Sequence, residues 1–209
     1  MTVLPSPALA DVDDVALGAR LLAGIPTNEA RGPELLGVLS DRAQRFGRSL
    51  ADADADEPAA HRVVERTGGL DRDVPTLARF SHRSGTVELF TDSIAFCEDL
   101  VDRMGWRPLF PAGSVRAAAL LHEDAHHLLA GRYARDLRVA VGHPALRLGR
   151  LVRWAHVAGA EELAAHAYAA RRLGLGRSPL LVTAAASAAL DRPAAVATAP
   201  AKEARTWAS

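Results

Sequence analysis

The segment AAALLHEDAHHLLAGRY, residues 117–133, places three histidines and two acids within a run of alanine and leucine. Its apolar residues recur at helical spacing, so we predict a helix over residues 115–133. Within HEDAH, His122 and His126 are four positions apart. They therefore lie above one another on one helix face, where both imidazoles can reach a single metal ion. Glu123 lies beside this pair, close enough to accept a proton from a metal-bound water without being a ligand itself.

A third ligand from another part of the chain would turn the histidine pair into a metal site. The segment HVAGAEELAAHAYAARRLG, residues 156–174, offers Glu161 and Glu162. Glu162 shares a helix face with small residues that allow close packing on the histidine-bearing helix, so we expect it to be the ligand. Glu161, about 100° away around the helix, is the alternative. His166, one turn after Glu162, could orient a ligand, stabilise an oxyanion or replace Glu162.

These two segments resemble the ImmA/IrrE-type metallopeptidases, which carry HExxH followed by a helix of pattern ExxAxxFA. The first motif lies in LLHEDAHHLL, residues 120–129, and the second in ELAAHAYA, residues 162–169, with tyrosine where the family usually has phenylalanine. The resemblance covers roughly residues 86–172. It implies a zincin-like fold with the catalytic features of a gluzincin.

The resemblance implies that the chain is a zinc peptidase, a hydrolase. The implied zinc ligands are His122, His126 and Glu162, and the implied general base is Glu123. Three protein ligands leave a fourth position to water, as in catalytic rather than structural zinc sites. The expected reaction is attack of the zinc-bound water on a peptide bond in a specific cytoplasmic protein or peptide. Resembling enzymes cut regulatory repressors, so a regulatory protein is one candidate substrate.

Two other functions stay open from the residues alone. Non-heme iron enzymes also use two histidines and one carboxylate, and iron with oxygen-dependent activity would identify one. A regulatory or binding module could keep the fold without turnover, although the presence of Glu123 argues against it.

The rest of the sequence predicts an α+β fold, mostly helical, with a small antiparallel sheet. LARFSHRSGTVELFTD, residues 77–92, alternates apolar and polar residues around a glycine loop, as a β-hairpin does. Ser114 is the predicted N-cap of the helix that carries HEDAH. Asp92 or Ser93 is the predicted N-cap of the preceding helix. Further helices are expected over residues 8–25, 33–50, 92–104, 146–173 and 179–190. His143 falls in a predicted turn.

We expect a single metallopeptidase-like domain over residues 1–190, with a helical scaffold in residues 1–80 and the metal-site core in residues 86–172. The alternation of acids and alanine in ADADADEPAA, residues 51–60, indicates a solvated linker. The last segment, residues 191–209, is rich in proline, alanine and charge, which predicts a disordered tail.

Composition narrows the functional classes. Lys+Arg and Asp+Glu balance at 25 each, so we expect neither a nucleic acid nor a membrane as partner. We expect Cys97, the one cysteine, to be a small residue of the core. The N-terminal sequence has no signal-peptide pattern. Both features favour the cytoplasm. No stretch reaches the roughly 18 apolar residues of a membrane span, and nothing in the sequence indicates the oligomeric state.

Overall fold

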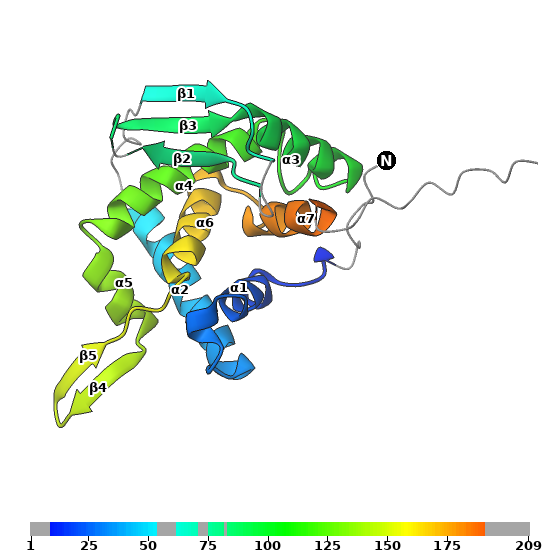
Figure 1. Cartoon of the computed structure of the whole chain (residues 1–209). Coiled ribbons are helices and arrows are strands. Elements are labelled where there is room, and N and C mark those ends of the chain that lie inside the picture. The colour runs from blue at the N-terminus through cyan, green and yellow to red at the C-terminus, as the bar shows by residue number, and fades with distance from the viewer. Residues whose placement is uncertain (1–8, 54–61, 71–74, 82, 191–209) are drawn as a thin grey trace, which may run out of the picture.

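The computed structural model describes residues 9–53, 62–70, 75–81 and 83–190. These residues form an α+β fold in which helices predominate (Figure 1). The helices are α1 (Asp14–Ala23), the short 3-10 helix η2 (Pro26–Asn28), α2 (Pro33–Ala53), α3 (Thr91–Arg103), α4 (Ser114–Ala130), α5 (Ala134–Val141), α6 (Ala160–Leu173) and α7 (Leu180–Leu190). The strands are β1 (Arg62–Arg66), β2 (Ala78–Ser81), β3 (Thr86–Phe90), β4 (Pro144–Leu148) and β5 (Leu151–Trp154).

The first three strands form one sheet in the order β1-β3-β2. β2 and β3 pair antiparallel, with Phe80 opposite Val87, so the hairpin predicted in residues 77–92 is confirmed. β1 was not predicted, and it pairs parallel to β3, which makes the sheet mixed rather than purely antiparallel. β3 is the central strand, and its Val87 and Leu89 are buried.

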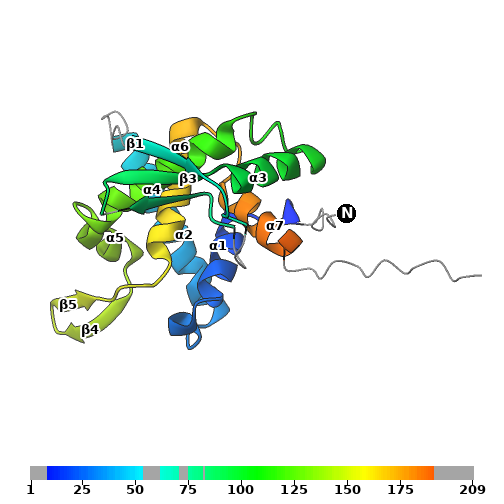
Figure 2. The ribbon, with the colours of Figure 1, turned by 45° about the horizontal axis from the view of Figure 1, so that its top comes forward.

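α6 is the central helix of the fold. It is buried without a break from Leu163 to Ala169, and α2 and α4 pack against it (Figure 1, Figure 2). Gly47 of α2 touches α6 so closely that a Cβ atom there would lie 2.1 Å from the carbonyl oxygen of Ala164. The N-terminal helix α2 therefore fixes the position of the helix that carries Glu162.

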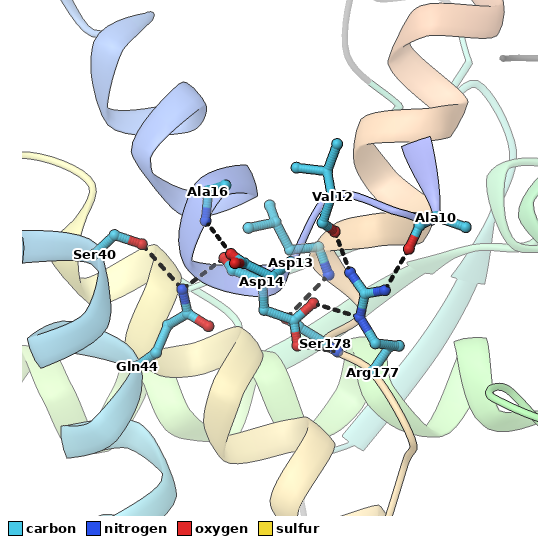
Figure 3. Close-up of polar contacts among 10 residues, drawn as sticks. Ala10, Val12, Asp13, Asp14, Ala16, Ser40, Gln44, Arg177 and Ser178 are labelled. Carbon is cyan, nitrogen blue, oxygen red and sulfur yellow. Dashed lines mark hydrogen bonds and ion pairs between the residues drawn. The ribbon is translucent and has the colours of Figure 1, made fainter. Parts of the chain in front are cut away.

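A polar contact ties the start of α1 to the connection between α6 and α7 (Figure 3). The Arg177 guanidinium donates to the Asp14 carboxylate at 2.9 Å and to the carbonyl oxygens of Ala10 and Val12. Gln44 of α2 donates to the Asp14 carbonyl oxygen at 2.8 Å. The guanidinium is partly buried and these acceptors satisfy its N–H groups, so the contacts hold the first and last described helices against each other.

The helix predicted over residues 146–173 is wrong in its first half. β4 and β5 form an antiparallel hairpin there, and α6 begins only at Ala160. The two strands are joined by Gly149 and Arg150, and Gly149 has a φ of 57°, which glycine adopts without strain. The hairpin extends beyond the helices in both views (Figure 1, Figure 2).

The predicted helix caps differ from the observed ones. Gly113 rather than Ser114 holds the N-cap position of α4, and the Glu98 carboxylate accepts hydrogen bonds from the Gly113 and Val115 amides. α3 begins at Thr91 with Phe90 at its N-cap position, so neither Asp92 nor Ser93 caps it. The Asp92 carboxylate accepts hydrogen bonds from the amides of residues 68 and 69.

Several predicted boundaries also shift. α4 ends at Ala130 rather than at residue 133, and α5 follows as a separate helix. The helix predicted over residues 8–25 is shorter, since α1 spans Asp14–Ala23. The linker predicted in residues 51–60 lies mostly outside the described residues, apart from residues 51–53 at the end of α2, and the predicted tail lies wholly outside them.

Cys97 is fully buried, as predicted for a small core residue. Burial raises the pKa of its thiol to about 12, with the charge of Glu98 as a smaller cause. No helix in the described part of the chain combines the length and apolar character needed to cross a membrane.

The close contact between α2 and α6 leads us to predict how a substitution at Gly47 changes the free energy of unfolding. Gly47→Ala will lower the free energy of unfolding by about 1–3 kcal/mol, because the new methyl group must displace the backbone at Ala164. Gly37→Ala in the same helix is the matched control, since a Cβ there meets nothing within 4 Å. It should raise the free energy by about 0.5–1 kcal/mol, because alanine is the better helix former. Urea denaturation followed by circular dichroism measures both, and a Gly47→Ala protein as stable as the wild type would contradict the contact.

Candidate metal centre

α4 and α6 bring together the three residues that the sequence predicted as metal ligands. The Nε2 atoms of His122 and His126 are 3.0 Å apart. Glu162 places Oε1 3.2 Å from His122 Nε2 and Oε2 3.1 Å from His126 Nε2. Among the described residues, these three form the group that could hold a metal ion, with ligand atoms all within 4.8 Å of one another. We call them the His-His-Glu group; Glu161 is not part of it.

The spacing of the His-His-Glu group suits a metal ion. Three tetrahedral ligand atoms bonded to zinc at about 2.1 Å are separated from one another by roughly 3.4 Å. The two imidazole nitrogens are 3.0 Å apart, a few tenths of an ångström below that value. Each of them also lies within 3.2 Å of one of the two Glu162 oxygens. Two imidazole nitrogens and a carboxylate oxygen are ligands that zinc accepts, although iron and other metals accept the same set.

The electrostatics of the group also favour a cation. Burial lowers the pKa of His122, and the neighbouring His166 lowers it further. Burial alone would lower the pKa of His126, but hydrogen bonding to Glu162 and the charge of that carboxylate raise it. Burial would raise the pKa of Glu162, yet the charges and hydrogen bonds of the surrounding histidines hold it well below its usual range. Glu162 is therefore ionised, which is the state a metal ligand needs.

Glu123 lies next to the His-His-Glu group and outside it, as predicted. Its Oε2 accepts a hydrogen bond of 2.8 Å from the backbone amide of Phe80 in β2. The Phe80 ring also contacts the ring of His127, with centroids 5.9 Å apart. Glu123 and His127, one turn apart on α4, thus both contact Phe80 of β2. The Phe80 amide orients the Glu123 carboxylate.

The outer edge of β2, on the side away from β3, borders this site. Phe90 N donates to the carbonyl oxygen of Leu77, so residues 77, 79 and 81 exchange the hydrogen bonds with β3. The backbone groups of Ala78 and Phe80 therefore point away from β3. The amide of Phe80 points to Glu123, which shows that this edge faces α4.

His166 lies beside the His-His-Glu group. Its Nε2 is 3.4 Å from Glu162 Oε1, and its ring centroid is 4.4 Å from that of His122. The Nδ1 atoms of His122 and His166 are buried and have no hydrogen-bond partner among the described residues. The structure thus brings His166 to the site, next to the three predicted ligands.

A cavity of about 850 Å³ opens onto the His-His-Glu group and Glu123. Its walls come from α1, α4, α7 and residues 75–78, and they are largely apolar, with Leu17, Leu21, Val115, Ala118, Leu180 and Ala184 among them. Because the wall on α4 begins at Ser114, eight residues before His122, the cavity extends about 12 Å along that helix. This cavity could not be predicted from the sequence, because residues far apart in the chain form it.

Two of the remaining histidines lie outside this site. His156 follows β5, before the start of α6. His143 was predicted to lie in a turn; it lies between α5 and β4, where its carbonyl oxygen accepts a hydrogen bond from the Ala155 amide. His61 and His82 fall outside the described residues.

No family model, no curated protein and no solved structure matches this chain. What connects the chain to metal chemistry is the His-His-Glu group, which is compatible with an HExxH zinc site.

The geometry predicts which carboxylate binds the metal. Protein purified without a chelator or a metal-binding tag will take up about one equivalent of Zn²⁺, and Glu162→Gln will weaken its affinity at least about a hundredfold, because an anionic ligand becomes a neutral amide. Glu161→Gln, the neighbouring carboxylate, is the matched control and will bind as the wild type does. Titration against a chromogenic zinc chelator gives the affinities. Equal affinities for wild type and Glu162→Gln would rule out the three-ligand site.

Proposed function

We propose that this chain is a zinc-dependent metallopeptidase of the ImmA/IrrE type that hydrolyses a peptide bond in a specific protein or peptide. One observation carries the proposal: an HExxH helix meets a glutamate from a second helix, while the motif's own glutamate stays outside the His-His-Glu group. That separation gives two carboxylates two different tasks, metal binding for Glu162 and proton transfer for Glu123.

Glu123 is suited to the role of general base. A zinc ion in the His-His-Glu group would lower the pKa of a water molecule towards neutrality and polarise a substrate carbonyl. The amide of Phe80 holds one oxygen of Glu123, which orients the carboxylate at the rim of the cavity. Its other oxygen can accept the proton of the attacking water, and the same carboxyl group can then give the proton to the leaving amine.

The surroundings of the site support an extended peptide as substrate. The outer edge of β2 offers the backbone groups of Ala78 for pairing with such a chain, as exposed sheet edges do in peptide-binding proteins. The cavity offers room for apolar side chains. Thr183 and Ser187 on its α7 wall direct their hydroxyl groups to carbonyl oxygens of their own helix, which makes this wall less polar than its sequence suggests.

His166 is proposed as the second catalytic residue. It lines the cavity, and its ring lies next to both His122 and Glu162. From this position it can stabilise the oxyanion that forms at the attacked carbonyl. It can instead orient Glu162, and the two roles differ in what they predict for metal affinity.

The mechanism is tested with Glu123→Gln. The variant will keep about one equivalent of zinc but lose roughly a thousandfold in cleavage rate, because an amide cannot accept the proton. Zinc-loaded wild type, Glu123→Gln and the control Glu161→Gln are incubated with peptides from a denatured proteome, and new N-termini are identified by mass spectrometry. Cleavage by Glu123→Gln at the wild-type rate would contradict the mechanism. Native iron with oxygen-dependent activity would favour a non-heme iron enzyme instead.

His166→Ala separates the two roles of this residue. If His166 stabilises the oxyanion, kcat will fall roughly a hundredfold while KM and zinc affinity stay unchanged. If it orients Glu162, zinc affinity will fall as well, and excess zinc will restore part of the rate. A variant with wild-type kcat and wild-type zinc affinity would remove His166 from the site's chemistry.

A further inference from the structure

The hairpin of β4 and β5 carries an exposed apolar face that no part of the described fold covers. Leu146, Leu148 and Leu151 are 51%, 61% and 68% exposed. Leu148 pairs with Leu151 across the hairpin, and Leu146 lies two positions before Leu148, so all three share one face. We call this the leucine face. Single exposed leucines are ordinary, but three on one face of a projecting element mark a binding surface.

The same hairpin is strongly cationic. Arg147, Arg150 and Arg153 are exposed, and none of them forms an ion pair with a described residue. The sequence contains no acidic residue between Asp136 and Glu161. The balanced charge of the whole chain therefore conceals a local excess of positive charge. Arg153 pairs with Leu146 and lies on the leucine face itself, whereas Arg147 pairs with Val152 on the opposite face.

A recess lies at the base of this hairpin, next to α5. Its volume is about 470 Å³, and its lining combines cationic or titratable side chains with apolar ones: Arg138, Leu146, Arg153, Trp154 and His156. Two guanidinium groups around one small recess suit an anionic group such as a phosphate. An apolar tip with a basic recess behind it matches the layers of a membrane surface, where acyl chains lie beneath anionic headgroups.

We propose that the β4–β5 hairpin binds the surface of an anionic phospholipid membrane. Leu148 and Leu151, on either side of the turn, enter the acyl region, while the arginines contact phosphate groups. Stable attachment of a peripheral protein needs both an apolar and a basic contribution, and the hairpin supplies both. A second copy of this hairpin would be repelled by its like charge.

The shape of the hairpin favours a membrane over a protein partner. It projects beyond the helices, so its tip is convex and reaches a flat, soft surface without obstruction (Figure 1, Figure 2). A protein partner would need a groove that matches three leucines and three arginines. None of the residues of this surface lines the cavity of the metal centre, so the inference stands or falls independently of the proposed peptidase activity.

Flotation with lipid vesicles tests the proposal. The full chain will bind vesicles that contain phosphatidylglycerol, will not bind pure phosphatidylcholine, and will be released at about 0.5 M salt, where screening shortens the range of charge attraction. Leu148→Ser with Leu151→Ser will abolish binding. Replacing Arg147, Arg150 and Arg153 by Gln will weaken it roughly a hundredfold. The matched control replaces Leu35 and Val38, two exposed apolar residues of α2, by Ser and will bind as the wild type does.

Insertion is measured separately with a fluorescent label. Leu151→Cys can be modified selectively with an environment-sensitive dye, because Cys97 is buried and its pKa is raised to about 12. The dye's emission will shift to shorter wavelength on anionic vesicles. Absence of wild-type binding to anionic vesicles would overturn the proposal. So would an unshifted dye on bound protein, or binding to an acidic polypeptide such as polyglutamate but not to vesicles, which would indicate an acidic protein partner.

Discussion

The close contact of α6 with its two neighbours is the constraint on which the rest of the structure depends. A side chain as short as glutamate can reach two imidazoles on another helix only if the two backbones approach closely, and small residues permit this. α6 has alanine at most of its buried positions, and on its other side Gly47 of α2 lies directly against Ala164. The alanines of α6 therefore have a structural role, because their small side chains allow the helices that carry the site to pack closely.

The His-His-Glu group places titratable side chains at half-buried positions beside the apolar core. Removing Glu162 and the adjacent histidines from water costs free energy, and their mutual hydrogen bonds offset only part of that cost. Glu162 lies in the first turn of α6, where the helix dipole favours negative charge. A half-buried cluster that is polar, titratable and partly lacking hydrogen-bond partners departs from the pattern of the apolar core around it, and such departures concentrate at functional sites.

The sequence predicted the site better than its surroundings. The histidine spacing and the choice of Glu162 over Glu161 both follow from helix periodicity, which holds within a single element. Residues 146–154 were mispredicted as helix because leucine and arginine are good helix formers, although alternation followed by Gly149 and Arg150 is the pattern of a two-residue hairpin turn. The parallel strand β1 and the cavity formed by α1 and α7 could not be foreseen, since both depend on contacts between residues distant in sequence.

The contact of Arg177 with Asp14 has a consequence for the conformational entropy of folding. These residues are 163 positions apart, and they join the first and last described helices, which together wall the cavity. Closing a loop of that length costs more conformational entropy than closing a short one. HEDAH supplies both histidines from one helix, so the His-His-Glu group needs only Glu162 from a later segment, whereas the cavity needs both ends of the described fold. Forming the cavity is therefore the step with the larger loop-closure cost.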